Sequence, residues 1–176
     1  VRLSAGGRRL RLRLTNEYGA HPLAIGAVRV ALVGPNGAVV AGSDRAVAFS
    51  DAASATLAPG APLLSDPVAL PTKALARLRI SLYLPTDTNG CTCHMSGSEL
   101  AQVSAGDTTK DAGPLAGPAT YRAFLSGVEV ESAAAPAPMT KAWKEEKETV
   151  ANYAVIFSSA GDKKRAAELL PSKEPL

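Results

Sequence analysis

Apolar and polar residues alternate along most of the first 131 residues, in short runs separated by Gly, Pro, Asn and Asp. In LRLRLT (10–15), three leucines fall on one face, and two arginines and a threonine fall on the other. In ALARLRISLYLP (74–85), four aliphatic residues share one face, opposite Arg77, Arg79 and Tyr83. A period of two predicts strands with one buried and one solvent-exposed face.

Further short strands are predicted at 27–33, 46–50 and 121–131. The Pro-Asn-Gly turn within 34–40 should lead into the next strand of a meander. The irregular stretch 86–120 suggests long surface connections with one strand, at 99–104. Many short strands at spacings of about ten residues predict an all-β fold, an antiparallel β-sandwich with jelly-roll-like topology.

The sequence changes character after residue 131. The small, proline-bearing segment 132–138 predicts a linker between a β-sandwich domain (1–131) and a lysine-rich tail (139–176). Apolar residues at helical spacing predict a helix over about 140–158, with Trp143 docking it onto the body; a buried strand over YAVIF (153–157) is the alternative. Deletion of the tail is expected to leave a soluble sandwich.

Composition limits the classes of function. A hydrophobic content of 46% suffices for a core, and 19 basic against 16 acidic residues leave a net charge of only +3, which argues against nucleic-acid binding. No apolar stretch is long enough to span a membrane, and no signal peptide is recognisable, so a soluble chain is expected. Because the chain opens on Val1 in strand-like sequence, we expect that an upstream segment has been removed.

Cys91 and Cys93 are the only cysteines and lie in the sequence CTCH. Free or loosely paired thiols are predicted, because a disulfide between residues so close in sequence would be strained. A Cys-x-Cys-His metal site would have suitable ligands, but tetrahedral zinc needs four donors and the other histidine, His21, is remote in sequence. No metal and no cofactor is therefore predicted.

Several segments, in the order of the chain, resemble the N-terminal β-sandwich region of secreted bacterial SGNH (GDSL-type) esterases and lipases. In that family the sandwich precedes a flavodoxin-like hydrolase domain, whose nucleophilic Ser lies in Gly-Asp-Ser and whose acid and base lie in a late Asp-x-x-His. This chain has neither motif, and Lys163 follows Gly161 and Asp162 where the serine would stand. The resembling segments are 1–32, 42–49, 63–70, 79–85, 92–94, 103–107 and 124–130.

The resemblance implies a non-catalytic accessory module of a secreted esterase, which packs on a hydrolase domain or partner chain or presents an ester substrate to it. One alternative is an SGNH-type esterase by family membership, with His94 beside Ser96 or Ser98 as a residual site. The other is a carbohydrate-binding module, against which the aromatic content of only 5% argues. The enzyme class stays open at this point.

No catalytic, cofactor-binding or metal-binding residue is assigned. Four residues are candidate ligand contacts: Asn16, Tyr18, Tyr83 and His94. Asn16 is expected to form the turn after the first strand, and Tyr83 to be a half-exposed packing residue. If the strands around 10–15 and 77–83 are neighbours, their arginines at 11, 13, 77 and 79 would form a basic stripe that could attract anionic glycans or lipid headgroups.

Overall fold

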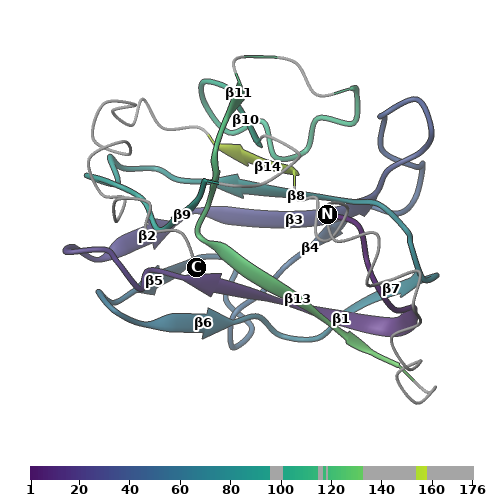
Figure 1. Cartoon of the computed structure of the whole chain (residues 1–176), viewed down its shortest axis with the longest axis horizontal. Coiled ribbons are helices and arrows are strands. Elements are labelled where there is room, and N and C mark those ends of the chain that lie inside the picture. The colour runs from purple at the N-terminus through teal and green to yellow at the C-terminus, as the bar shows by residue number, and fades with distance from the viewer. Residues whose placement is uncertain (96–100, 115–116, 118, 133–153, 158–176) are drawn as a thin grey trace, which may run out of the picture.

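The structure is a computed structural model that describes residues 1–95, 101–114, 117, 119–132 and 154–157. Within these residues every regular element is a β-strand, and no helix is found that could cross a membrane. The strands form two main layers with the apolar core between them (Figure 1). The predicted all-β, antiparallel fold is confirmed.

The first layer is built around β1 (Gly7–Thr15), the longest strand. One edge of β1 pairs with β13 (Leu125–Glu131). The other edge of β1 pairs with two strands: β6 (Pro62–Leu64) near the end of β1 and β7 (Val68–Thr72) near the start of β1. All three pairings are antiparallel, so β1 is the central strand of this sheet.

The second layer has β8 (Leu78–Tyr83) and β3 (Ala27–Leu32) as its longest strands, paired antiparallel over six residues. Two small ribbons complete the fold: β2 (Leu23–Ile25) with β5 (Ala55–Leu57), and β9 (Cys93–His94) with β12 (Arg122–Ala123). The second layer runs in the order β11 (Ala119–Thr120), β10 (Ala101–Val103), β14 (Ala154–Phe157), β8, β3 and β4 (Arg45–Ala46).

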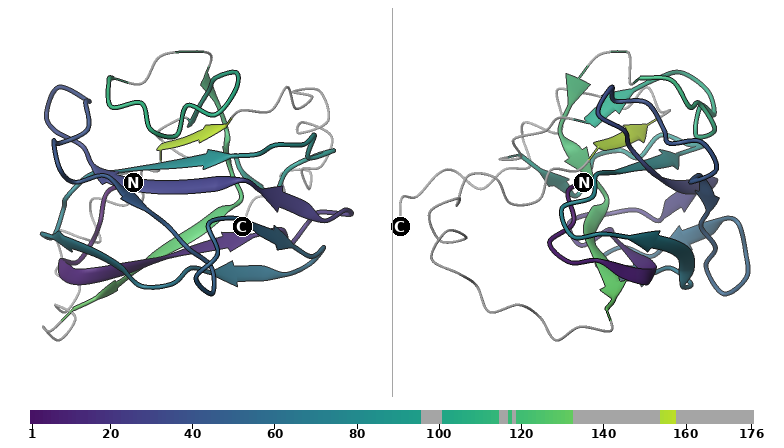
Figure 2. Two further views of the ribbon diagram at one scale, coloured as in Figure 1. Left: turned by 180° about the vertical axis from the view of Figure 1, so that it is seen from behind. Right: turned by 90° about the vertical axis from the view of Figure 1, so that its right-hand side faces the viewer.

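The alternation read from the sequence explains how the layers pack. Leu10, Leu12 and Leu14 on β1 are at most 1% exposed and point into the core, whereas the arginines between them are exposed. Complete burial of each leucine contributes about 2 kcal/mol of transfer free energy. Leucine, isoleucine and valine side chains of β3 and β8 close the core from the other layer. Figure 2 shows the two layers from two further directions.

One prediction about exposed arginines is wrong, and the condition for the basic stripe is not met. Arg79 was expected on the solvent face of β8, but it is only 3% exposed, because the turn at 34–38 and the loop at 107–112 cover the outer face of the sheet there. The basic stripe does not form, because β1 and β8 belong to different sheets. Residues 78, 80, 82 and 84 are buried in the core as predicted.

The tail contributes a strand rather than a helix where it is described. Residues 154–157 form β14, which lies between β8 and β10 and runs parallel to both. The predicted helix is therefore wrong at these positions and the alternative strand is confirmed there; β-branched and aromatic residues in YAVIF suit a strand. The rest of the predicted helix and Trp143 lie outside the described residues, and the division of the chain at 131 and 139 stays a prediction.

The Pro-Asn-Gly turn forms where it was expected. Gly37 has φ +80°, a left-handed conformation that glycine adopts without steric cost, and Asn36 accepts a hydrogen bond from the N–H of Ala38 through its side chain. The strand after this turn is reduced to a single bridge, Val33 to Val39. The strand expected at 46–50 is likewise short, since β4 covers only Arg45–Ala46.

Candidate functional site

All four candidate ligand residues gather at the end of the sandwich where β1 and β8 both finish (Figure 1). Asn16 and Tyr18 directly follow β1, Tyr83 is the last residue of β8, and His94 belongs to β9. The sequence separation between these residues gave no indication that they would be neighbours. This end of the molecule is therefore the candidate functional site.

Thr92 holds this end together. Its hydroxyl accepts a hydrogen bond from the N–H of Tyr18 (3.0 Å), and its carbonyl accepts one from the N–H of Phe124 (2.8 Å). The carbonyl of Phe124 in turn accepts from the N–H of Thr15 (2.8 Å). We call these four residues, Thr15, Tyr18, Thr92 and Phe124, the Thr92 junction; it joins three segments that are distant in sequence.

The cysteines on either side of Thr92 are bonded to each other. Cys91 and Cys93 form a disulfide with their Cα atoms 5.2 Å apart, which lies within the usual range for this bond. The prediction of free or loosely paired thiols is wrong, because the two residues lie close enough for the bond to form. The bond constrains the backbone on both sides of Thr92.

Phe124 adopts a backbone conformation that is rare for a bulky residue. Its φ is +62°, in the left-handed region, and its side chain is buried. Such a conformation costs about 1–3 kcal/mol and persists only where the surroundings impose it. Here the hydrogen bonds to Thr92 and Thr15 impose it, and they turn the chain from β12 in one ribbon into β13 in the first layer.

Asn16 has a structural role that occupies its side chain. Its side chain is buried, and Nδ2 donates to the carbonyls of His21 (2.9 Å), Leu57 (3.3 Å) and Ala58 (3.3 Å). A Cβ at Gly19 would collide with the Asn16 carboxamide, so the turn needs glycine there. Asn16 forms the turn after β1, as predicted, and its amide donors are already occupied.

The three tyrosines at this end differ in exposure. Tyr18 is 71% exposed, and Tyr121, which precedes β12, is 40% exposed. Tyr83 is half-buried as predicted, because its ring lies over Gly26, where a Cβ would come within 2.5 Å of Cδ1. Tyr18 is thus the candidate residue whose side chain is most available to a partner, and Tyr121 joins it although the sequence analysis did not select it.

His94 lies beside a buried arginine. It pairs with Arg122 across the β9–β12 ribbon and its side chain is exposed. Partial burial first, and then the positive charge of Arg122, lower the pKa of His94 below its ordinary value of 6.5. Ser96 and Ser98, the serines that would accompany it in a residual catalytic site, lie outside the described residues.

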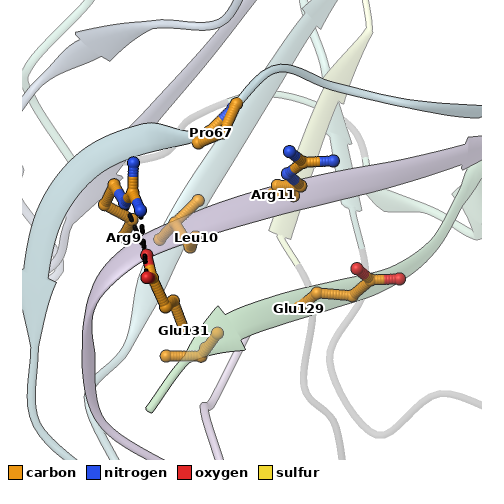
Figure 3. A pocket seen from close by; sticks show the side chains of 7 residues that line it. Arg9, Leu10, Arg11, Pro67, Glu129 and Glu131 are labelled. Atoms are coloured by element: carbon orange, nitrogen blue, oxygen red, sulfur yellow. Dashed lines mark hydrogen bonds and ion pairs between the residues drawn. The ribbon is translucent and has the colours of Figure 1, made fainter. Parts of the chain in front are cut away.

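The exposed arginines of β1 face acids on β13. Arg9 forms a two-pronged ion pair with Glu131, with Nη2 2.9 Å from Oε1, and Arg11 stands opposite Glu129 in the register (Figure 3). The hydrogen bonds from Arg9 lower the pKa of Glu131. These residues line a shallow groove of about 310 Å³. Its charges are balanced across the two strands, so the groove is not a polyanion site.

The described residues contain no group of three or more His, Cys, Asp and Glu side chains placed to hold a metal ion. In the same part of the chain neither histidine side chain hydrogen-bonds a serine or threonine hydroxyl, which is the contact that a Ser–His pair requires.

No protein-family model and no curated protein matches this chain.

The structural roles of Thr92 and Phe124 were not recognised from the sequence. A threonine between two cysteines does not by itself indicate a hydrogen-bonding role, and a phenylalanine in FLSGVEV looks like an ordinary strand residue. Neither role could be inferred, because both depend on contacts among the three segments that the Thr92 junction joins.

Proposed function

We propose that this chain is a non-catalytic β-sandwich module that accompanies a secreted ester hydrolase of the SGNH (GDSL) type, packing on its hydrolase domain or presenting substrate to it. One observation carries the proposal. The segments that resemble this family coincide with strands from both layers of one core: 1–32 contains β1, β2 and β3, 79–85 contains most of β8, and 124–130 contains most of β13. The resembling segments thus contribute strands to both layers of the core.

The chemistry of the described residues supports a non-catalytic role. A serine becomes a nucleophile only when a base such as histidine takes its proton, and the resulting oxyanion needs nearby donors. Of the two histidines, His94 stands beside Arg122, and the backbone carbonyl of His21 accepts from Asn16. The chain also contains no Gly-Asp-Ser and no Asp-x-x-His sequence.

The partner surface that we propose is the end of the sandwich around the Thr92 junction. Tyr18 and Tyr121 are exposed there, and tyrosine is enriched in protein interfaces because it offers a large, stiff contact area. The backbone beneath is held by the disulfide and by the hydrogen bonds of Thr92. A rigid platform that carries exposed tyrosines loses little conformational entropy when it binds.

The test is to mix the purified chain with a separately expressed SGNH-type hydrolase domain and to measure complex formation by calorimetry. We expect binding, with Tyr18→Ala and Tyr121→Ala each weakening it by about tenfold, a cost typical of a central aromatic contact. Leu75→Ala is the matched control, because Leu75 is an exposed apolar residue (54%) that precedes β8, at the other end of the sandwich. It should leave affinity unchanged.

Other results would favour the alternatives. Turnover of a short-chain nitrophenyl ester by the chain alone, lost in His94→Ala or Ser96→Ala, would contradict the non-catalytic role and support an esterase. Retention on an insoluble polysaccharide, together with no complex with the hydrolase domain, would support a carbohydrate-binding module.

A further inference from the structure

Asparagine followed by glycine occurs twice in the chain, as Asn36–Gly37 and as Asn89–Gly90. This dipeptide is especially prone to spontaneous deamidation, because glycine has no side chain to shield its backbone nitrogen from the asparagine carboxamide. Both pairs lie outside the strands, both asparagines are exposed, and both glycines have a positive φ. The two pairs therefore share the reactive dipeptide and the exposure that the reaction needs.

Hydrogen bonds hold the Asn36–Gly37 pair in its turn. The N–H of Gly37 donates to the carbonyl of Gly34 (3.0 Å), and Oδ1 of Asn36 accepts from the N–H of Ala38 (3.1 Å). A hydrogen bond to a carbonyl stabilises the protonated form of an amide, so the Gly37 nitrogen is a poorer nucleophile than a free one. Both reacting groups, the nitrogen and the carboxamide, are thus engaged.

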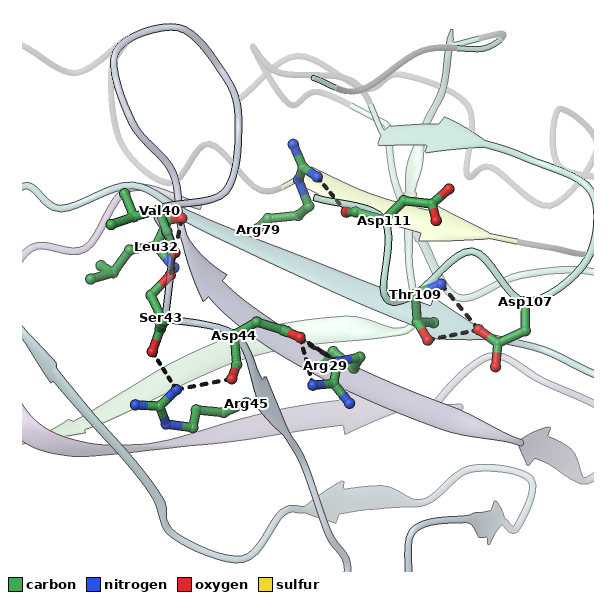
Figure 4. Close-up of polar contacts among 11 residues, drawn as sticks. Arg29, Leu32, Val40, Ser43, Asp44, Arg45, Arg79, Asp107, Thr109 and Asp111 are labelled. Atoms are coloured by element: carbon green, nitrogen blue, oxygen red, sulfur yellow. Dashed lines mark hydrogen bonds and ion pairs between the residues drawn. The ribbon is translucent and has the colours of Figure 1, made fainter. Parts of the chain in front are cut away.

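The buried Arg79 fastens the same turn to the sheet. Its Nη2 donates to the carbonyl of Gly37 (2.8 Å), and its Nη1 donates to the carbonyl of Asp111 (3.0 Å), as Figure 4 shows for the second bond. Rotation of the Gly37 peptide out of the turn would leave a buried donor of Arg79 without its acceptor, which is costly. The turn therefore resists the rearrangement that ring closure requires.

The Asn89–Gly90 pair lies in the loop between β8 and β9 and lacks these restraints. The N–H of Asn89 donates to Oδ1 of Asp87 (3.0 Å), which fixes neither reacting group. Among the residues that the structure describes, the Gly90 N–H and the Asn89 carboxamide have no hydrogen-bond partner. Nothing within this part of the chain therefore opposes their approach to each other.

We propose that Asn89 is a site of spontaneous deamidation in the folded chain, whereas Asn36 is protected by its turn. The Gly90 nitrogen gives up its proton and bonds to Cγ of Asn89, the bond from Cγ to Nδ2 breaks, and ammonia leaves with that proton. The product is a cyclic succinimide. Water then opens the ring at either carbonyl and leaves aspartate or isoaspartate at position 89. The reaction needs no reactant other than water.

The modification changes the segment that leads into Cys91 and Thr92. Position 89 gains a negative charge, and isoaspartate also lengthens the backbone by a methylene group shortly before the disulfide. Residues 85–90 are exposed or half-buried, so the core and the melting temperature should change little. The reaction involves no partner, and its success or failure therefore leaves the proposed function unaffected.

The test is to incubate the full, disulfide-bonded chain at mildly alkaline pH and to follow both asparagines by peptide mapping with mass spectrometry. Fragmentation that separates isoaspartate from aspartate identifies the two products. We expect Asn89 to convert with time and Asn36 to react at least about tenfold more slowly, as expected where several hydrogen bonds must break first. Asn89→Gln, which would have to form a larger ring, should remove most of the acidic species that accumulate in ion-exchange chromatography. Asn36→Gln is the matched control and should leave them.

The same incubation in urea separates the effect of the fold from that of the local sequence. The two asparagines should react at similar rates in the unfolded chain, because the hydrogen bonds of the turn at 34–38 are lost there. Equal rates in the folded chain, or no reaction at Asn89 in it, would overturn the proposal. It is also overturned if the ratio of the two rates is the same with and without urea, since the residues next to each pair would then decide the difference.

Discussion

Two buried polar side chains, Asn16 and Arg79, attach loops to the sandwich through backbone carbonyls. Asn16 donates to carbonyls from two segments beside β1, and Arg79 donates to carbonyls from two segments above β8. Backbone carbonyls in loops lack the partners that a sheet provides, so a buried side-chain donor stabilises the position of the loop. Each of these side chains thus holds loops that hydrophobic packing alone would not fix.

Asn16→Ala should therefore lower the free energy of unfolding by about 2 kcal/mol, because it leaves buried carbonyls without their donor. Urea denaturation followed by circular dichroism measures the change. Asn36→Ala is the control: Asn36 is exposed in the turn at 34–38, and its loss should cost no more than about 0.5 kcal/mol. Equal effects of the two variants would contradict the role assigned to Asn16.

His94 should make stability depend on pH. Its pKa is lower in the folded chain than in the unfolded chain, so the unfolded chain binds the proton first as pH falls. The free energy of unfolding should decrease as pH drops below the ordinary histidine pKa of 6.5, and this contribution should level off below the folded pKa. His94→Gln should be less sensitive to pH in this window, as measured by urea denaturation at a series of pH values. Parallel curves for variant and parent would contradict the shift.

At the scale of the elements, the sequence predicts inner faces better than outer ones. The leucines of β1 and the aliphatic residues of β8 were assigned to the core correctly, because a period of two is a local property of each strand. The burial of Arg79 could not be predicted, since its covering segments contribute Gly37 and Asp111, which lie 42 and 32 positions away. What covers a strand depends on long-range contacts.

At the candidate site, too, local roles were predictable from the sequence and long-range contacts were not. Asn16 and Tyr83 were given the correct local roles, because turn chemistry and alternation can be read along the chain. Their gathering with Tyr18 and His94 at one end depends on the strand directions in two layers and on the Thr92 junction. No pattern within a single segment carries that information.

Removal of the disulfide tests how β9 supports this end. Cys91→Ser combined with Cys93→Ser should lower the free energy of unfolding by about 1.5 kcal/mol, a small value because the chain-entropy model ties it to the very short loop that the bond closes. Amide hydrogen exchange at Tyr18 and Phe124 should accelerate, since Thr92 accepts from both, while exchange at Leu12 in the middle of β1 should change far less. Uniform acceleration across the chain would contradict a local role.

At the scale of the whole molecule, acids on one strand offset part of the positive charge of the neighbouring strand. The four arginines at 8, 9, 11 and 13 stand beside a strand that carries Glu129 and Glu131. Exposed charges more than about 10 Å apart are largely screened at 0.1 M salt, so the balance has to be local to be effective. Two of the four arginines, Arg9 and Arg11, therefore stand opposite acids on β13.

We accordingly expect no retention of the chain on heparin near physiological salt. Glu129→Gln combined with Glu131→Gln should produce retention, because it leaves the arginines of β1 without nearby acids. Asp51→Asn combined with Asp87→Asn changes the net charge equally at exposed sites elsewhere and should not produce it. The salt concentration needed for elution measures the difference. Equal retention of both double variants would show that net charge alone decides.

The pairing of β1 with β13 also has a mechanical consequence. The register places Arg9 opposite Glu131, so the start of β1 and the end of β13 lie at the same corner of the sheet. Hydrogen bonds in an antiparallel pair lie perpendicular to the strands, so a force separating these two ends would break them one after another, as in opening a zipper. The Arg9–Glu131 ion pair stands at the mouth of this zipper and would be the first contact to yield.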